Sequence, residues 1–183
     1  MDIKLIKSEF ENFKKYYDKK NIKSSIACLN LILKENPNEV KAIYYLGTIY
    51  LENKNFAEAK KYYIKYIKLY PNNLYVHFNL GLANYNLGEL EDSIKNFKNV
   101  LKIDNNHLES INTIANIYRE SDNLDKAKVY YEKCLSIDPN KKKVFLGYSR
   151  LLLKLNDHKK GLKYLYAATG IIRFNKDKVE LIL

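Results

Sequence analysis

A 34-residue period is the feature that most constrains what this chain can fold into. Pro37 and Pro71 lie 34 residues apart, Pro139 follows after 68, and Asn105 fills the position between them. Self-similarity at a fixed step of this size is the signature of repeat architectures, in which each repeat is one supersecondary unit. The 183 residues therefore have room for about five such units.

Five further series of residues keep the same step without a single insertion, so chance agreement is negligible. Two registers hold mainly small residues: Gly47, Gly81, Ala115 and Ser149, and then Ser25, Ala59, Ser93, Ala127 and Gly161. A third is bulky throughout: Leu29, Tyr63, Phe97, Tyr131 and Leu165. The last two are Ile22, Phe56, Leu90 and Leu124, broken by His158, and Tyr16, Tyr50 and Tyr118, broken by Asn84.

Each unit contains two amphipathic patterns of helical period. One stripe recurs at i, i+3, i+4 and i+7 through Ile43, Leu46, Gly47 and Tyr50, and a second runs through Phe56, Ala59, Tyr63 and Ile67. Six glycines and three prolines are too few for a fold rich in turns. The period therefore predicts an all-α chain of helix pairs.

The prolines and the small residues predict how these helices end and pack. Asn36 and Asp138 precede a proline, and we expect them to act as N-caps, since proline suits the first turn of a helix. A small residue such as Gly47 on the first helix lets a bulky residue such as Tyr63 on the second approach closely. One hairpin buries too little apolar surface alone, so neighbouring hairpins must stack.

These residues resemble the tetratricopeptide repeat, a 34-residue unit with Leu-Gly, Tyr, Ala, Phe or Tyr, Ala and Pro at set spacings. The best match is the run Leu46-Gly47, Tyr50, Ala59, Tyr63 and Pro71. The outer units depart from the pattern, with Asn12-Phe13 in the first and Tyr148-Ser149, His158 and Arg173 in the fifth. Terminal repeats of such arrays are commonly atypical, because one side faces solvent.

The resemblance implies a right-handed α-solenoid of antiparallel helix pairs that forms one array over residues 1–183. The expected repeats are about 6–39, 40–73, 74–107, 108–141 and 142–175. The tail, residues 176–183, is expected to form a short C-terminal capping helix, with Val179, Leu181, Ile182 and Leu183 supplying apolar surface.

In this family the inner helices line a concave groove, and their non-core residues contact the ligand. Carried over by register, the expected groove residues are Phe10, Lys14, Tyr44, Tyr45, Thr48, Tyr75, Phe78, Asn79, Leu82, Asn112, Thr113, Asn116, Lys143 and Arg150, with Glu109 beside them. Tyr supplies contact area at small entropic cost and Asn can pair with peptide backbone, so the set suits an extended peptide or a partner helix. The alternative is that several of these aromatics, Tyr44 and Tyr75 above all, pack between adjacent repeats.

A more specific function known in the family does not fit these residues. Its chaperone-binding members hold a carboxylate with a clamp of Lys and Asn, then Asn, then Lys and Arg. The central units have Tyr44, Thr48, Asn79, Glu109 and Thr113 there, so only Asn79 matches. We expect no such clamp.

No motif in the chain indicates catalysis, a metal or a cofactor. The sequence contains no Walker A, GxGxxG, HExxH or GxSxG motif. Cys28 and Cys134 are far apart and fall at core-like positions of the outer helices, where free Cys acts as a small hydrophobe. The start of the chain carries too many charges for a signal peptide and no segment is apolar enough to span a membrane, so a cytoplasmic location is expected.

The formal net charge of +11 leaves two readings open. It would attract nucleic acid, an anionic surface or an acidic peptide, or it reflects a compositional bias toward lysine. The lysines are dispersed over the outer helices rather than clustered. We therefore expect a non-enzymatic protein-binding scaffold, with a basic nucleic-acid-binding or anionic-surface-binding repeat as the alternative, and with self-association through the C-terminal tail as a further possibility.

Overall fold

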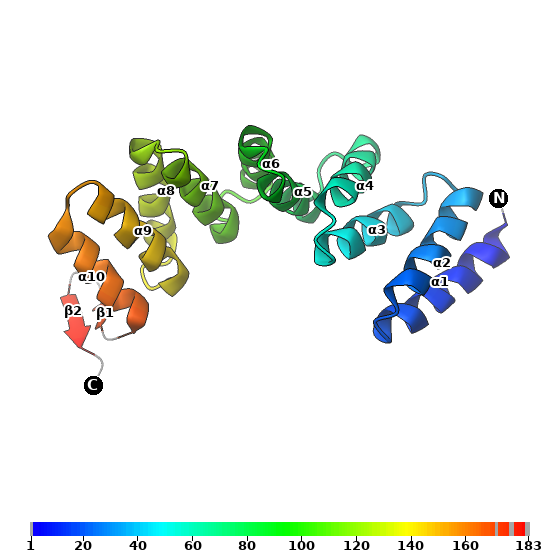
Figure 1. Ribbon diagram of the computed structural model, residues 1–183, viewed down its shortest axis with the longest axis horizontal. Helices are drawn as coiled ribbons and strands as arrows, with labels where there is room; N and C mark the ends of the chain where they lie inside the picture. The colour runs from blue at the N-terminus through cyan, green and yellow to red at the C-terminus, as the bar shows by residue number, and fades with distance from the viewer. Residues whose placement is uncertain (1, 171, 176–177, 182–183) are drawn as a thin grey trace. The chain divides into compact units, whose positions relative to one another are not determined.

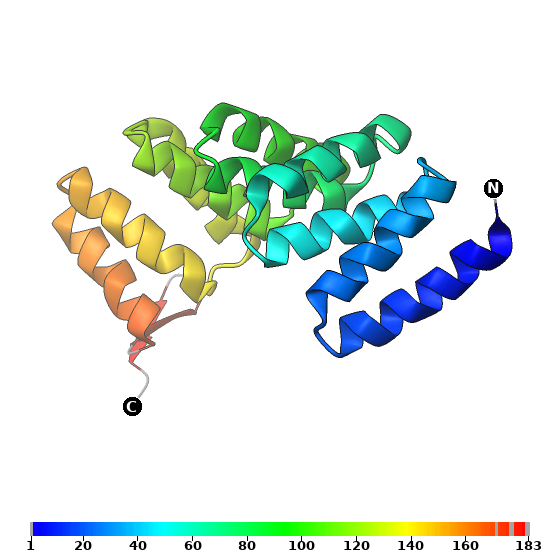
Figure 2. The same ribbon diagram turned by 45° about the vertical axis from the view of Figure 1, so that its right-hand side comes forward.

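The computed structural model describes residues 2–170, 172–175 and 178–181, with side chains over 2–170 (Figure 1). The described residues form ten helices and two strands: α1 (Ile3–Asp18), α2 (Ile22–Glu35), α3 (Val40–Glu52), α4 (Phe56–Leu69), α5 (Leu74–Asn86), α6 (Leu90–Ile103), α7 (Leu108–Glu120), α8 (Leu124–Ile137), α9 (Lys142–Lys154), α10 (His158–Thr169), β1 (Ile172–Asn175) and β2 (Lys178–Leu181). They divide into two compact units, Met1–Ile103 (unit 1) and Asp104–Leu183 (unit 2). Within each unit, consecutive helices pack as antiparallel pairs, as α1 and α2 show in Figure 2.

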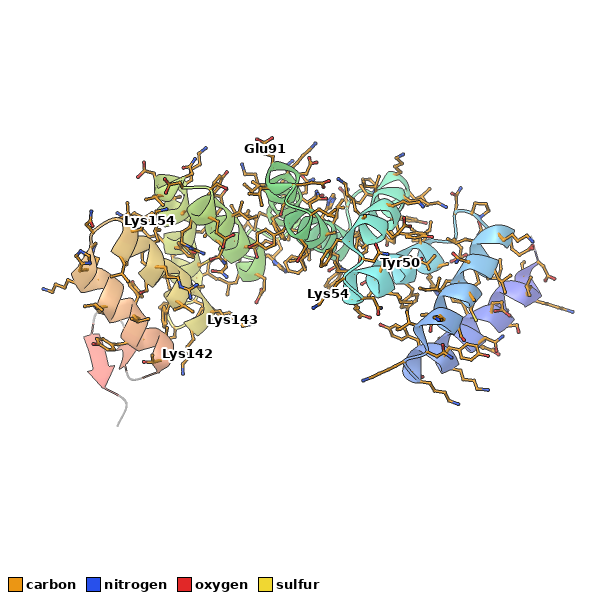
Figure 3. The ribbon with its side chains drawn as sticks, viewed as in Figure 1. Tyr50, Lys54, Glu91, Lys142, Lys143 and Lys154 are labelled. Carbon is orange, nitrogen blue, oxygen red and sulfur yellow. The ribbon has the colours of Figure 1, made fainter. Side chains whose placement is uncertain are left out.

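The turn inside each helix pair repeats with the 34-residue step. The residue two positions before the start of the second helix adopts a left-handed backbone, at Lys20, Lys54, Gly88, Asp122 and Asn156. In the second pair the next amide, that of Asn55, donates to the Tyr50 carbonyl at 2.8 Å, which closes the end of α3. The Asn55 side chain then accepts from the Glu58 amide and caps α4. One short turn therefore ends one helix and begins the next (Figure 3).

The turns between pairs differ from the prediction made at the prolines. Asn36 and Asp138 are the C-caps of α2 and α8, whereas Glu39 and Lys141 occupy the N-cap positions of α3 and α9. The Asn36 side chain accepts from the amide of the residue two positions later, and the Asp138 side chain does the same. Asn and Asp favour this local turn, so the proline lies in the connection rather than in the first turn of the helix.

The close fit of small and large side chains is confirmed inside the pairs. A Cβ added at Gly47 would lie 2.7 Å from Cε1 of Tyr63, and one at Gly81 would lie 2.8 Å from Cε1 of Phe97. Tyr63 and Phe97 are completely buried. The predicted fold class, an all-α chain of consecutively packed helix pairs, is therefore correct.

The predicted C-terminal capping helix over residues 176–183 is wrong for the part that the structure describes. Lys178–Leu181 form β2, which pairs with β1 in an antiparallel ladder that sets Ile172 opposite Leu181. Apolar and polar residues alternate in both segments, and this period of two matches a strand and would scatter apolar groups around a helix. Residues 176–177 and 182–183 lie outside the described part of the chain.

Candidate functional site

The predicted groove residues lie on the odd-numbered helices of both units. Unit 1 carries Phe10, Lys14, Tyr44, Tyr45, Thr48, Tyr75, Phe78, Asn79 and Leu82 on α1, α3 and α5, and unit 2 carries Asn112, Thr113, Asn116, Lys143 and Arg150 on α7 and α9. We call the surface of α1, α3 and α5 the odd-helix face of unit 1.

Three of the predicted residues meet at one hollow of this face. It has a volume of about 260 Å³ and is lined by Val40, Lys41, Tyr44, Tyr45, Tyr66, Asn73 and Tyr75, and we call it the tyrosine pocket. The starts of α3 and α5 supply most of the wall, and Tyr66 comes from near the end of α4. Four phenol rings therefore surround a space the size of one large side chain.

Ring-to-ring contacts hold the walls of the tyrosine pocket in place. The Tyr45 ring lies 4.8 Å from the ring of Phe13, a core residue of α1, and 5.8 Å from that of Tyr44. The Tyr44 ring in turn meets the Tyr66 ring edge-on at 6.0 Å. Aromatic pairs at such separations add about 0.5–1.5 kcal/mol beyond the area they bury, so these contacts favour the ring positions that form the pocket.

Asn73 links Tyr66 of the pocket to the start of α5. It was not among the residues predicted from the sequence. Its side-chain oxygen accepts from the Val76 amide at 3.1 Å and caps α5, while its amide nitrogen donates to the Tyr66 hydroxyl at 3.0 Å. The signal that was available is its position directly before the apolar stripe of α5, where an Asn is a preferred N-cap.

The tyrosines of the pocket differ in how far they are exposed. Tyr75 is 70% exposed, whereas Tyr44 and Tyr45 are half-buried against their neighbours. The idea that Tyr75 packs between repeats does not fit this exposure. Tyr45, by contrast, packs against the core as well as facing the pocket.

The other predicted residues of unit 1 mostly serve the fold. Thr48 and Asn79 both hydrogen-bond to the hydroxyl of buried Tyr63. The Tyr63 hydroxyl oxygen lies 3.4 Å from Oγ1 of Thr48. Burial raises the pKa of Tyr63 to about 12, an effect that its hydrogen bonds with Thr48 and Asn79 partly oppose. Phe10, Phe78 and Leu82 are half-buried, and Lys14 is exposed.

In unit 2 the tyrosine equivalent to Tyr63 is Tyr131, and it makes a shorter hydrogen bond. The Tyr131 hydroxyl donates to Oδ1 of Asn116 at 2.6 Å and accepts from Nε of Arg119 at 3.3 Å. Asn112 and Thr113 are half-buried, and the Thr113 hydroxyl donates to the carbonyl of its own helix at Glu109. Asn116 therefore serves helix pairing as well as being a predicted groove residue.

The basic residues of unit 2 lie at the surface of α9. Lys143 and Arg150 are exposed, and Lys142 and Lys143 lie together at the start of the helix while Lys154 lies at its end (Figure 3). Lys154 pairs with Asp122.

The lysines of the outer helices lie at the surface, and some are already paired. A second hollow, of about 430 Å³ on α4, is lined by Ala57, Lys60, Lys61, Ile64, Lys65 and Lys68. Lys60 pairs with Glu89, and Lys61 pairs with Glu58. These ion pairs leave less free positive charge on this side than the lysine count indicates.

Three further properties follow from the described residues. Within 2–170 and the two strands, no helix is both long enough and apolar enough to cross a bilayer. The same residues contain no cluster of three or more His, Cys, Asp or Glu side chains that could hold a metal ion. Cys28 and Cys134 are free thiols, both buried.

Residues 108–141 match the family model described as "Tetratricopeptide repeat". Residues 18–100 match the model described as "Anaphase-promoting complex, cyclosome, subunit 3", which is also built of repeats of this type. The chain is 30% identical over 121 residues to the protein CTR9 homolog of Arabidopsis thaliana, a match that covers 64% of this chain and 11% of that protein. The chain therefore spans about a tenth of the length of this relative.

Solved structures share the fold at low sequence identity. The crystal structure of MamA superposes with a TM-score of 0.84 at 20% identity and covers 91% of each chain. YrrB, described as a tetratricopeptide repeat protein with an unusual peptide-binding site, superposes with a TM-score of 0.75 at 16% identity over 86% of this chain and 81% of that one. These likenesses agree with the family matches and with the 34-residue step of the helix pairs. The chain belongs to the tetratricopeptide repeat family.

Proposed function

We propose that the chain is a non-enzymatic scaffold that binds a peptide segment or a helix of a partner protein on the odd-helix face of unit 1. The observation that carries this proposal is the tyrosine pocket, a preformed aromatic hollow on the odd-helix face. Preformed sites bind more tightly, because less side-chain freedom is lost on binding. Aromatic anchors seated in such pockets dominate the energetics of many protein interfaces.

The repeat family supports the same role in a general way. Helix-pair arrays present extended surfaces made of residues that the fold does not need, and these surfaces bind other proteins. The peptide-binding site named for YrrB belongs to that protein. For this chain it supports only the expectation that the fold can present a peptide-binding surface.

The structure indicates which variant tests the proposal cleanly. A double change of Tyr45 and Asn79 to Ala would also remove contacts to Phe13 and Tyr63, so lost binding could reflect lost stability. Tyr75→Ala removes a 70% exposed ring of the pocket and leaves the core untouched. Tyr166→Ala is the matched control, because Tyr166 is 50% exposed on α10 in unit 2.

The test is an affinity capture from the source cell's lysate at low and high salt with nuclease present. The proposal expects a discrete protein that survives high salt and nuclease, that is lost with Tyr75→Ala and that is retained with Tyr166→Ala. Capture that disappears with nuclease or falls steeply with salt would instead indicate phosphate contacts, and would refute the proposal. Equal capture by both variants would show that the tyrosine pocket does not bind the captured protein.

Two further parts of the proposal are tested separately. We place the protein in the cytoplasm, because both of its cysteines are free thiols, as a reducing compartment keeps them. Fractionation of the source cell would test this. Self-association through the C-terminal tail is tested by deleting residues 177–183 and measuring the mass in solution, where an unchanged mass would rule it out.

A further inference from the structure

The tyrosine pocket is too small for a free ligand of ordinary size. Its volume of about 260 Å³ lies below the roughly 300–1,000 Å³ of typical small-molecule sites. It is large enough for one big side chain of a longer ligand. The pocket is therefore suited to a single anchor residue of a peptide that continues across the surface.

The walls favour an aromatic anchor. Tyr44, Tyr45 and Tyr66 present ring surfaces that their mutual contacts hold in place, and exposed Tyr75 is free to close over an inserted ring. Offset and edge-to-face ring contacts with an inserted Phe, Tyr or Trp would extend this arrangement. The Tyr66 hydroxyl already accepts from Asn73, so its own hydrogen remains available to an acceptor on the ligand.

The charge at the pocket decides between an acidic and a basic neighbour of that anchor. Lys41 is the one charged residue among the lining residues, and no acidic side chain lines the pocket. Lys41 is exposed, and among the described residues no carboxylate lies within ion-pair distance of it. Residues 1–103 also carry 17 lysines against 11 acidic residues. A ligand cation would therefore be repelled despite the tyrosine faces, and a carboxylate would be attracted.

We propose that the tyrosine pocket recognises a segment of a partner protein in which one aromatic side chain is flanked by Asp or Glu. The aromatic ring enters between Tyr44, Tyr66 and Tyr75, and a neighbouring carboxylate pairs with the Lys41 ammonium. This inference rests on the proposed function, since it names the chemistry of the segment that the scaffold binds. It differs from a two-carboxylate clamp, because the aromatic anchor supplies most of the affinity and one lysine selects the sign of the charge.

The absence of Trp from the chain allows a direct test. The probes are three acetylated and amidated pentapeptides with a central Trp, flanked on both sides by two Asp, two Ser or two Lys residues. Excitation of Trp then reports on the peptide alone, through its emission maximum and its anisotropy, as the full-length protein is added. We expect the Asp peptide to bind about two- to fivefold more tightly than the Ser peptide at about 0.1 M salt, and the Lys peptide to bind most weakly.

Variants locate the binding and assign the charge preference. Tyr75→Ala should weaken the Asp peptide about tenfold, whereas Tyr166→Ala should leave it unchanged. Lys41→Glu should reverse the order of the Asp and Lys peptides, whereas Lys98→Glu, an exposed lysine on α6 of the same unit, should leave the order as it is. Circular dichroism would verify that each variant keeps its helices.

The possible outcomes separate this inference from the proposed function. Equal affinity for all three peptides, still lost with Tyr75→Ala, would overturn the acidic preference and leave a peptide-binding pocket in place. Tightest binding of the Lys peptide would overturn it in favour of a cation held by the tyrosine faces. A lack of saturable binding by any peptide would overturn the pocket as an anchor site, while a partner captured from lysate would still support the scaffold.

Discussion

The close approach of α5 and α6 predicts that a single added methyl group at Gly81 destabilises unit 1. A Cβ there would lie 2.8 Å from Cε1 of Phe97 and 3.0 Å from both Cδ1 and Cζ of that ring. The ring cannot retreat easily, because Phe97 is completely buried. The Ser93 hydroxyl also donates to the Gly81 carbonyl at 2.9 Å, which ties the two helices together at this point.

Two effects of opposite sign set the expected size of the change. Overpacking of a well-packed core costs about 1–3 kcal/mol, and contacts this short place Gly81→Ala at the upper end. Replacing Gly by Ala inside a helix returns about 1 kcal/mol of helix propensity. We therefore expect Gly81→Ala to lower the free energy of unfolding by about 2 kcal/mol. Phe97→Leu should relieve much of this, with a coupling of about 1 kcal/mol in a double-mutant cycle.

The control comes from the next repeat, where Ala115 occupies the same register and is completely buried in α7. Helix propensity alone predicts that Gly81→Ala stabilises and Ala115→Gly destabilises. Packing predicts that both substitutions destabilise, because the second helix of each pair packs closely against the residue that is present, Gly81 in one pair and Ala115 in the other. Urea unfolding followed by circular dichroism would measure both changes, and hydrogen exchange would show which helices open. A Gly81→Ala variant as stable as the parent, or more so, would refute the reasoning.

Substitutions at four other positions test separate parts of the structure by urea unfolding. Lys54→Gly should raise the free energy of unfolding by about 0.5–1 kcal/mol, because Lys54 holds a left-handed backbone with φ of 60°. Asn73→Ala should lower it by about 1–2 kcal/mol through the lost cap, whereas Asn73→Asp, which keeps an acceptor for the cap, should lower it less. Tyr131→Phe should lower it by about 1–2 kcal/mol, since Asn116 loses a hydrogen bond of 2.6 Å. Burial raises the pKa of the Cys134 thiol from 9.0 to about 12. The buried neutral thiol therefore contributes fully to the free energy of unfolding below pH 9, and this contribution is lost as the pH rises toward 12. Cys134→Ala should flatten that decline.

The regular part of the fold could be read from the sequence because the period is a local and repeated signal. Helices α3, α5, α7 and α9 begin at Val40, Leu74, Leu108 and Lys142, which keep the 34-residue step. The series of small and bulky residues correctly predicted the contact of Gly47 with Tyr63, since helix pairing places those registers face to face. The C-terminal segment has no such repeat behind it. Apolar and polar residues do alternate in its two four-residue strands, but the helix was predicted from the apolar residues alone, without regard to that alternation.

The candidate site could be predicted only in part. Tyr44, Tyr45 and Tyr75 were reached by register, because they lie on the odd-numbered helices. Tyr66 and Asn73 were not, because the first belongs to α4 and the second to the turn that follows it. Thr48, Asn79 and Asn116 were predicted as groove residues, and the structure shows each of them bonded to a buried tyrosine as well.

The sequence by itself therefore determined the helix pairs, their 34-residue step, the small-into-large packing and the family. The tertiary structure decided where the polypeptide makes a preformed hollow, which lysine of the odd-helix face stands beside it, and which tyrosine hydroxyls are already bonded. The physical reason is that periodic burial is encoded in neighbouring residues of one helix. A pocket depends on the positions of side chains from several helices and a turn, and only their packing brings these together.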